Sequence, residues 1–458
     1  MNSSSLKTLH FKTALVADQW QNDIVVSVDE NGFIAAIETA TTNQEVSESF
    51  DAIALPGMPN VHSHAFQRAF AGLSEYRTSQ NDSFWTWRKL MYEFLLKLSP
   101  EDVFVIARQL YIEMLLAGYT WVGEFHYVHN DIDGSRYENL GELSDAIIRA
   151  ADEVGIGLCM LPVLYQRGGF DNQPLSGGQK RFELGNEEFL KLIDAIAKKT
   201  NEQLKLGIAL HSLRAVDASA GNEIIKRIPA EYPIHIHVAE QTKEVDDCSA
   251  AHGKRSVQYL LDNFDVDSRW CLIHSTHLND AELAGIAQSG AVAGLCPTTE
   301  ANLGDGIFRA QDFLESGGLI AIGSDSHCSV DMREELRILE YGQRLSGRNR
   351  AVLGTNVRSV GRNLYEQLAC NGGKAIGVPT GRIQIGARAD FALVDPNHPA
   401  IAGVSGDAII DRLIFCNADD PLVGTIVGGK ARTMDDSDFL DLVMKSHLDF
   451  LDVSKKLI

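Results

Sequence analysis

The sequence lacks long apolar runs and has few cysteines. No stretch approaches the roughly 18–20 consecutive apolar residues of a membrane helix, so no membrane-spanning segment is expected. The seven cysteines are scattered, form no CxxC pair and are odd in number, which is typical of reduced thiols in a cytosolic enzyme. The N-terminal segment has neither the apolar region nor the cleavage site of a signal peptide. We therefore expect a cytoplasmic protein without a membrane partner.

Positive charge is scarce as well. Lysine and arginine number 41 against 62 aspartates and glutamates, which gives a formal net charge of −21. Such an acidic protein repels phosphate backbones, so a nucleic-acid partner is not expected. An anionic small molecule would need a local cluster of basic side chains in this chain.

The sequence does contain a regular alternation of segments. Residues 1–57 read as short strands with turns, and from residue 58 short apolar runs alternate with amphipathic stretches of helical length. This alternation is typical of repeated βα units around a parallel sheet. The apolar runs are eight in number: Met58–His64, Tyr119–Phe125, Gly157–Leu164, Leu206–Leu210, Ile234–Ala239, Trp270–His274, Ala291–Cys296 and Leu319–Gly323.

Eight βα units predict an α/β protein with a (β/α)8 TIM barrel. A doubly wound open sheet is the alternative, but it rarely has eight parallel strands, and no GxGxxG follows the first run. Strands and turns return after about residue 380, so we expect a small β-sandwich-like domain built from both chain ends. The predicted small domain comprises residues 1–57 and 379–458, the latter with a C-terminal helix, and the predicted catalytic barrel comprises residues 58–378.

Histidines and an aspartate fall at the ends of several predicted strands. His62 and His64 are two residues apart at the end of the first strand, so both side chains point to the same face. His237 lies at the end of the fifth strand, and Asp325 follows the eighth. The C-terminal ends of barrel strands meet at one mouth, where the active sites of this fold lie. We predict that these four residues hold a divalent metal ion.

The donor set indicates the chemistry. Three imidazoles and a carboxylate without a thiolate suit Zn²⁺ or Fe²⁺, and such an ion lowers the pKa of a bound water towards ~7. Asp325 can also accept a proton from that water, and Glu240 can pass a proton to a substrate nitrogen. His274, at the end of the sixth strand, can polarise the atom under attack or orient the water. The predicted reaction is metal-assisted hydrolysis at an sp² carbon.

Four segments resemble the amidohydrolase superfamily. They are HSH after the first strand, HVAE at the fifth, IHSTH at the sixth and GSDSH at the eighth. They are similar to the mononuclear, deaminase-type members, because binuclear members have a bridging lysine or glutamate at strand four. Here that strand ends in His211, and Lys205 lies at its opposite end. The resemblance implies one metal ion per subunit.

Longer segments between about residues 55 and 340 resemble the N-formimidoyl-L-glutamate deiminases within that superfamily. They are LPGMPNVHSHAFQRAFAGL, NDSFWTWRKLMY, GEFHYVHND, HSLRAV, HIHVAEQTKEVDDC and TEANLGDGIF. The resemblance implies zinc-dependent hydrolysis of N-formimidoyl-L-glutamate to N-formyl-L-glutamate and ammonia in histidine degradation. It also implies that this small dianionic substrate is bound by Gln67, Arg88, Tyr127, His211 and Arg214. Arginine suits this role because its planar donor fork matches a carboxylate.

Other interpretations are open at this point. A deaminase of the same fold acting on guanine, cytosine or a nucleoside would need a pocket that stacks on and reads a ring. An imidazolonepropionate ring hydrolase fits the WTWRKLMY and HSLR segments poorly, and a non-catalytic barrel would have lost metal ligands. The aromatic residues Phe84, Trp85 and Trp87 are interpreted as core or subunit interface, with a lid wall as the alternative. The long first loop that contains them favours a homodimer.

Overall fold

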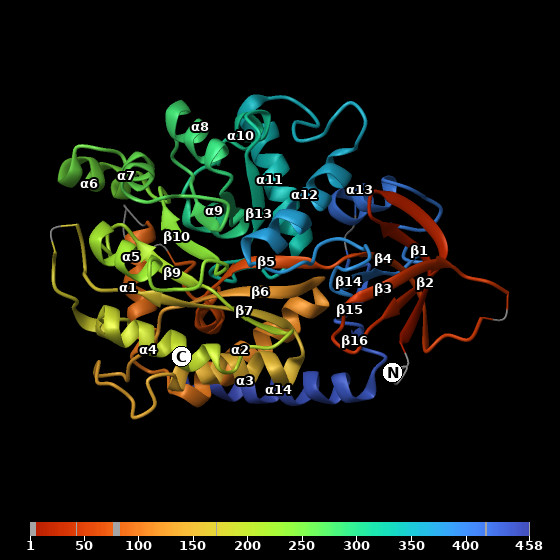
Figure 1. Ribbon diagram of the computed structural model, residues 1–458, viewed down its shortest axis with the longest axis horizontal. Coiled ribbons are helices and arrows are strands. Elements are labelled where there is room, and N and C mark those ends of the chain that lie inside the picture. The colour runs from red at the N-terminus through yellow and green to blue at the C-terminus, as the bar shows by residue number, and fades with distance from the viewer. Residues whose placement is uncertain (1–5, 43, 77–82, 171, 417–418, 458) are drawn as a thin grey trace.

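The computed structural model contains a barrel of parallel strands and a separate sheet that lies beside it (Figure 1). Two residues of the NDSFWTWRKLMY segment, Asn81 and Asp82, lie outside the described part of the chain. None of the described helices combines the length and the hydropathy that crossing a membrane requires. The structure describes residues 6–42, 44–76, 83–170, 172–416 and 419–457.

The barrel strands are parallel and pair in chain order. They are almost wholly buried, because helices cover their outer side and the facing strands fill the interior. The short strands Leu204–Leu206 and Ile208–Ser212 together occupy one strand position of the barrel. Both pair with the strand Gly157–Leu164, and only Gly207 separates them. The resulting eight positions confirm the predicted TIM barrel. The strands are β5 (Met58–Ser63), β6 (Tyr119–His126), β7 (Gly157–Leu164), β8 (Leu204–Leu206), β9 (Ile208–Ser212), β10 (Ile234–Val238), β11 (Trp270–His274), β12 (Val292–Leu295) and β13 (Leu319–Ile322).

The barrel closes between β5 and the segment that follows β13. The backbone N–H of Asp325 donates to the carbonyl of His62 at 3.0 Å, and the N–H of His64 donates to the carbonyl of Asp325 at 3.2 Å. Gly323 allows this approach, because a Cβ at that position would lie 2.7 Å from the backbone nitrogen of His62. The closure therefore aligns His62, in β5, and His64, which follows this strand, with Asp325.

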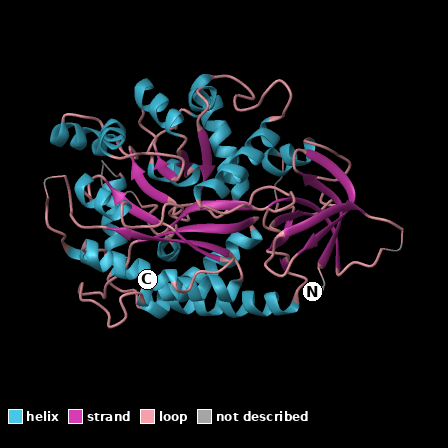
Figure 2. Ribbon diagram, viewed as in Figure 1, coloured by secondary structure: helices cyan, strands magenta, loops and turns pink. Residues whose placement is uncertain are grey.

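Helices surround the barrel strands (Figure 2). The long connection after β5 holds a 3₁₀ helix and two α-helices, so the first βα unit is enlarged as predicted. The helices are η1 (Ala65–Phe70), α1 (Phe84–Leu95), α2 (Pro100–Leu116), α3 (Glu142–Val154), η2 (Gly177–Arg181), α4 (Asn186–Ala197), α5 (Ala218–Ile225), α6 (Thr242–His252), α7 (Ser256–Asn263), α8 (Asp280–Ser289), α9 (Pro297–Leu303), α10 (Ala310–Glu315), α11 (Met332–Gly347), α12 (Val360–Ala375), α13 (Ala408–Phe415) and α14 (Ser437–Leu457).

Both ends of the chain contribute to the second sheet, as the sequence predicted. Its seven strands form one hydrogen-bonded sheet in the order β16-β15-β14-β4-β1-β2-β3. The sheet has a hydrophobic core of its own, which includes Leu9, Phe11, Val26 and Phe391. The strands are β1 (Lys7–Val16), β2 (Gln19–Val28), β3 (Ile34–Thr39), β4 (Glu48–Pro56), β14 (Phe391–Val394), β15 (Leu422–Val427) and β16 (Lys430–Thr433).

The last helix, α14, packs against the barrel and not against the small sheet's core. Figure 1 shows it on the outer surface beside α2 and α3. Arg108 of α2 pairs with Asp449 at 2.5 Å, and Lys456 pairs with Asp102 at 2.6 Å. The chain thus returns to the barrel after it has completed the small sheet.

Candidate metal centre and its pocket

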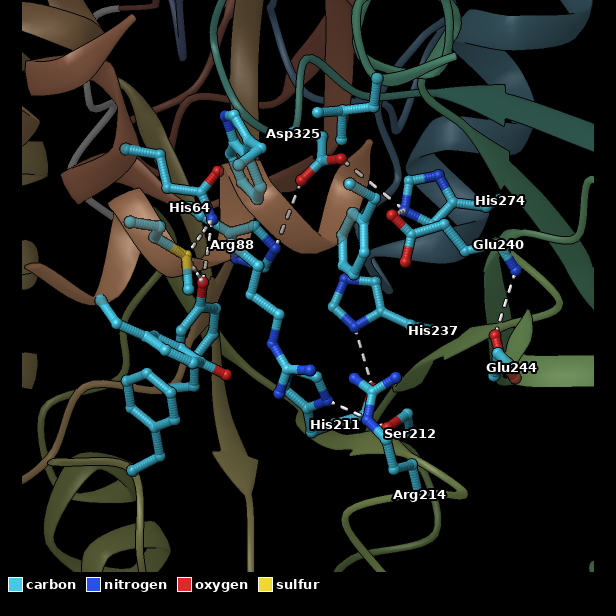
Figure 3. A pocket seen from close by; sticks show the side chains of 18 residues that line it. His64, Arg88, His211, Ser212, Arg214, His237, Glu240, Glu244, His274 and Asp325 are labelled. Carbon is cyan, nitrogen blue, oxygen red and sulfur yellow. Dashed lines mark hydrogen bonds and ion pairs between the residues drawn. The ribbon is translucent and has the colours of Figure 1, made fainter. Parts of the chain in front are cut away.

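Four side chains converge at the C-terminal mouth of the barrel, and Figure 3 shows three of them, His64, His237 and Asp325. His62 and Ser63 are the last two residues of β5, and His64 follows them. His237 lies in β10, and Asp325 lies three residues after the end of β13. The Nε2 atoms of His62 and His237 are 3.0 Å apart. Asp325 Oδ1 lies 3.4 Å from His62 Nε2 and 3.3 Å from His64 Nε2. Bonds of about 2.0–2.1 Å to a tetrahedral zinc ion separate the ligand atoms by about 3.3 Å, so these spacings fit a single ion.

Backbone hydrogen bonds fix the tautomers of two of these rings. His64 Nδ1 donates to the carbonyl of Phe125, and His237 Nδ1 donates to the carbonyl of His211, each at 2.9 Å. Because a carbonyl only accepts, each Nδ1 carries the hydrogen and each Nε2 presents a lone pair to the centre. Burial lowers the pKa of His62, His64 and His237, which favours neutral rings. Lone pairs that face a carboxylate repel it unless a cation lies between them, so the donor set fits a divalent metal.

His274, the last residue of β11, faces the same centre among three carboxylates. Its Nε2 atom lies 3.7 Å from Asp325 Oδ2 and 3.8 Å from Glu240 Oε1, and its Nδ1 atom bonds Glu300 Oε1 at 3.2 Å. Burial alone would lower the pKa of His274, but the carboxylates of Glu240, Glu300 and Asp325 raise it to about 10. Burial raises the pKa of Glu240 to about 7. The pair therefore offers a cationic donor and a carboxyl that exchanges protons near neutral pH.

Glu300 is a site residue that the sequence did not single out. Its Oε1 atom also accepts the backbone N–H of Cys296 at 2.9 Å, which holds the carboxylate beside His274. The potential metal-ligand atoms of His274, Cys296 and Glu300 lie close together. The hydrogen bonds that join Glu300 to His274 and to Cys296 explain why they do so. The sequence feature that could have identified Glu300 is the TTEAN segment after the seventh predicted strand. The C-terminal end of that strand lies at the same mouth of the barrel as the metal centre.

Glu124, on β6, is a second carboxylate that the sequence did not single out. It accepts hydrogen bonds from Ser63 Oγ at 2.5 Å and from the backbone N–H of Ala65 at 2.7 Å. Burial raises the pKa of Glu124 to about 7. Ser63 points to the opposite face of β5 from His62 and His64. Glu124 therefore fixes the end of β5 from behind the metal centre.

The backbone is strained at three strand ends around the mouth. Ala239, His274 and Asp325 have positive φ angles of 53°, 68° and 48°. Residues with a side chain rarely adopt this left-handed region, which costs on the order of 1–3 kcal/mol each. Such strain persists where the surrounding structure imposes it, and it is typical of functional sites.

Arg88 and Arg214 give the pocket a positively charged wall. Arg88 belongs to α1, and Arg214 follows β9. Arg88 Nη2 donates to the hydroxyl of Tyr165 at 3.2 Å, and Arg214 Nε is buried without a hydrogen-bond partner. In the described part of the chain, no carboxylate oxygen lies within 4.0 Å of either guanidinium nitrogen. Arg214 acts electrostatically on the carboxyls of Glu240 and Glu244 without a direct ion pair. Two half-buried guanidiniums that form no ion pair among the described residues indicate a site for an anion.

The other predicted substrate residues, Gln67, Tyr127 and His211, line the same pocket. Gln67 Nε2 donates to the hydroxyl of Tyr127 at 2.9 Å, and Gln67 Oε1 is buried without a partner. Figure 3 shows His211 and Arg214 on the side of the pocket away from Asp325. The structure thus brings all five predicted substrate residues into one cavity next to the metal centre.

The aromatic residues of α1 form part of the pocket wall. Phe84 and Trp87 both line the cavity, and the Trp87 ring packs 5.7 Å from that of Phe70. Both residues therefore form part of the cavity wall, and Trp87 also packs against the hydrophobic core. A subunit interface at these residues stays a prediction.

A bridging ligand for a second ion is missing from strand four. Lys205 lies at the opposite end of the barrel, where it pairs with Glu202 at 3.0 Å. His211 belongs to none of the clusters of potential metal ligands found among the described residues. The geometry therefore agrees with the mononuclear arrangement.

The sequence and the fold resemble those of several known proteins. Residues 53–432 match the amidohydrolase family. The chain is 48% identical over 427 residues to formimidoylglutamate deiminase of Pseudomonas aeruginosa, with coverage of 93% of this chain and 94% of the relative. The crystal structure of an amidohydrolase from Brucella melitensis is 41% identical, with a TM-score of 0.92 and coverage of 98% and 99% of the two chains. An adenosine deaminase from Xanthomonas campestris with bound zinc has a TM-score of 0.80 over 98% of both chains. Its 19% identity makes this a likeness of fold alone.

Proposed function

Because this chain belongs to the amidohydrolase family, we propose that it is a metal-dependent hydrolase that converts N-formimidoyl-L-glutamate and water into N-formyl-L-glutamate and ammonia. The 48% identity to a formimidoylglutamate deiminase over nearly the whole of both chains supports this substrate. The fold alone does not identify this substrate, since proteins with the same barrel architecture catalyse many different reactions. We further propose that the reaction is a step of histidine degradation.

In this proposal His62, His64, His237 and Asp325 hold one zinc ion. The donor set suits zinc, and the zinc in the Xanthomonas campestris structure of the same fold supports the choice. Iron(II) suits the same donors, so metal analysis of the purified protein is the measurement that separates the two. When bound, the ion lowers the pKa of a water molecule towards ~7 and so supplies a nucleophile at neutral pH.

The side chains around the ion manage the protons. Asp325 accepts a proton from the water that adds to the formimidoyl carbon. Glu240, whose pKa is about 7, can accept and release a proton and transfers it to the former C=N nitrogen. Protonated His274 stabilises negative charge that develops at the reacting centre. Asp325 then passes the proton that it took from the water to the same nitrogen, and the tetrahedral intermediate breaks its bond to this nitrogen. Ammonia leaves while Glu240 takes the proton of the hydroxyl and the formyl C=O forms.

The guanidiniums of Arg88 and Arg214 carry the assignment of the substrate. N-Formimidoyl-L-glutamate has two carboxylates, and each guanidinium can bind one of them through two parallel hydrogen bonds. A nucleobase deaminase needs aromatic faces and amide groups that read a neutral ring. Two half-buried cations that form no ion pair among the described residues would only add a desolvation cost in such a pocket.

The direct test is release of ammonia from N-formimidoyl-L-glutamate by the zinc-loaded protein. We expect turnover of this compound and none above background with guanine, cytosine, adenosine or imidazolonepropionate. Turnover of a nucleobase without ammonia release from N-formimidoyl-L-glutamate would overturn the proposal.

Glu300→Gln is expected to lower kcat about 10- to 100-fold, the usual size of the effect when a partner behind a site residue is changed. Glutamine keeps the shape and one acceptor oxygen but removes the charge that stabilises protonated His274. KM and zinc content should change by less than about twofold, because substrate binding and the ion depend on other side chains. Glu315→Gln, at the exposed end of α10, is the matched control and should behave like the wild type. Loss of zinc in the Glu300 variant would mean that this residue supports the ion instead of His274.

A further inference from the structure

Three cations surround one indole beside the pocket. The centroid of the Trp85 ring lies 5.7 Å from the guanidinium carbon of Arg88, 5.8 Å from that of Arg214 and 5.7 Å from Lys243 Nζ. Trp85 and Arg88 belong to α1, Arg214 follows β9, and Lys243 belongs to α6. Both arginines line the pocket, whereas Trp85 is not among the residues that line it. The indole therefore joins three separate loops and helices of the barrel mouth.

The cations differ in their counter-ions. Lys243 Nζ contacts both carboxylate oxygens of Asp247, at 2.8 and 2.6 Å. Arg88 and Arg214 have no carboxylate within 4.0 Å among the described residues. Long side chains of like charge tend to move apart and to sample many rotamers. Tyr165 accepts a hydrogen bond from Arg88, and the carboxyls of Glu240 and Glu244 interact electrostatically with Arg214. The ring of Trp85 is a contact that both guanidiniums share.

We propose that Trp85 is a positioning residue that orients Arg88 and Arg214 toward the two carboxylates of the substrate. The identity of that dianion rests on the proposed function. The face of an indole attracts cations because its π electrons give it a negative potential, and tryptophan does so best among the aromatic residues.

An indole suits this task better than an acidic residue. A carboxylate beside Arg88 and Arg214 would neutralise them and compete with the substrate, whereas the uncharged ring leaves their donors free. Guanidiniums that are already oriented lose less rotamer freedom when the dianion binds, and its affinity rises accordingly. Trp85 therefore acts on binding and leaves the chemical step to the metal centre.

The test compares Trp85→Leu, which removes the aromatic face, with Trp85→Phe, which keeps a weaker one. We expect the Kd of N-formyl-L-glutamate, measured by calorimetry on the zinc-loaded protein, to rise about tenfold for leucine and less for phenylalanine. KM for N-formimidoyl-L-glutamate should rise by a similar factor while kcat stays unchanged. N-Formimidoyl-L-glutamine, which carries one carboxylate, should be affected less than the dianionic substrate.

Trp20→Leu is the matched control. Trp20, on β2 of the small sheet, also has a cation over its ring, Arg362 at 6.0 Å, but it lies outside the pocket. Its replacement should leave Kd and KM at wild-type values.

Three results would overturn the inference. The first is an equal Kd in Trp85→Leu and Trp20→Leu, and the second is a wild-type protein that does not bind N-formyl-L-glutamate. The third is a loss of kcat in Trp85→Leu that is equal for N-formimidoyl-L-glutamate and N-formimidoyl-L-glutamine, because this result would indicate a collapsed pocket. A wild-type protein that binds N-formyl-L-glutamate but releases no ammonia would refute the proposed function alone, because the calorimetric comparison does not depend on turnover.

Discussion

Replacing Asp325 by alanine is expected to lower kcat/KM at least ~10³-fold, since it removes a general base and a proposed metal ligand together. The side chain faces His62, His64 and His274 at 3.3–3.7 Å. The backbone groups that close the barrel, the N–H and carbonyl of Asp325, are retained in the variant. The loss of activity should therefore occur without loss of the fold, which thermal unfolding followed by circular dichroism can check.

Asp325→Asn separates the two roles of this residue. Asparagine keeps an oxygen donor but accepts no proton at neutral pH, so we expect it to retain more zinc than the alanine variant at similarly low kcat. Asp246→Ala, on the exposed surface of α6, deletes the same side chain away from the site and should leave turnover unchanged. Normal turnover by Asp325→Ala would refute the site as assigned.

Arg214→Ala should raise KM about 10- to 150-fold, because a hydrogen bond between charged groups contributes about 1.5–3 kcal/mol. Arg214 lines the pocket with a buried Nε atom that lacks a protein partner, so its proposed partner is a substrate carboxylate. It contacts none of the proposed metal ligands, and zinc content measured by mass spectrometry should equal that of the wild type. KM and kcat are measured from the initial rate of ammonia release.

Two further variants control this prediction. Arg214→Lys keeps the charge but loses the planar fork, so KM should lie between those of the wild type and Arg214→Ala. Arg227→Ala removes a surface arginine that pairs with Glu187 and Glu223, and its KM should match the wild type. If Arg214→Ala loses zinc, the residue supports the metal centre and the assignment to the substrate is wrong.

Much of the fold could be predicted because apolar periodicity reports burial. The run Gly157–Leu164 is β7 with the same bounds, and the run Met58–His64 is β5, one residue shorter. A parallel barrel brings the C-terminal ends of all its strands to one mouth. Residues at those ends, such as His237 and Asp325, could therefore be grouped from the sequence, and their roles stay predictions until the variants are measured.

The sequence by itself determined the strand order, the face on which each histidine lies and the family of the chain, since these depend on local spacing and on long motifs. Only the tertiary structure decided that Asp325 closes the barrel onto His62, that Glu300 bonds His274 and that the guanidiniums of Arg88 and Arg214 both lie over the ring of Trp85. Periodicity tells which way a side chain points, but not which side chain of a distant segment it meets. In this metal centre the paired groups come from different strands and loops, and their distances follow from how the barrel closes.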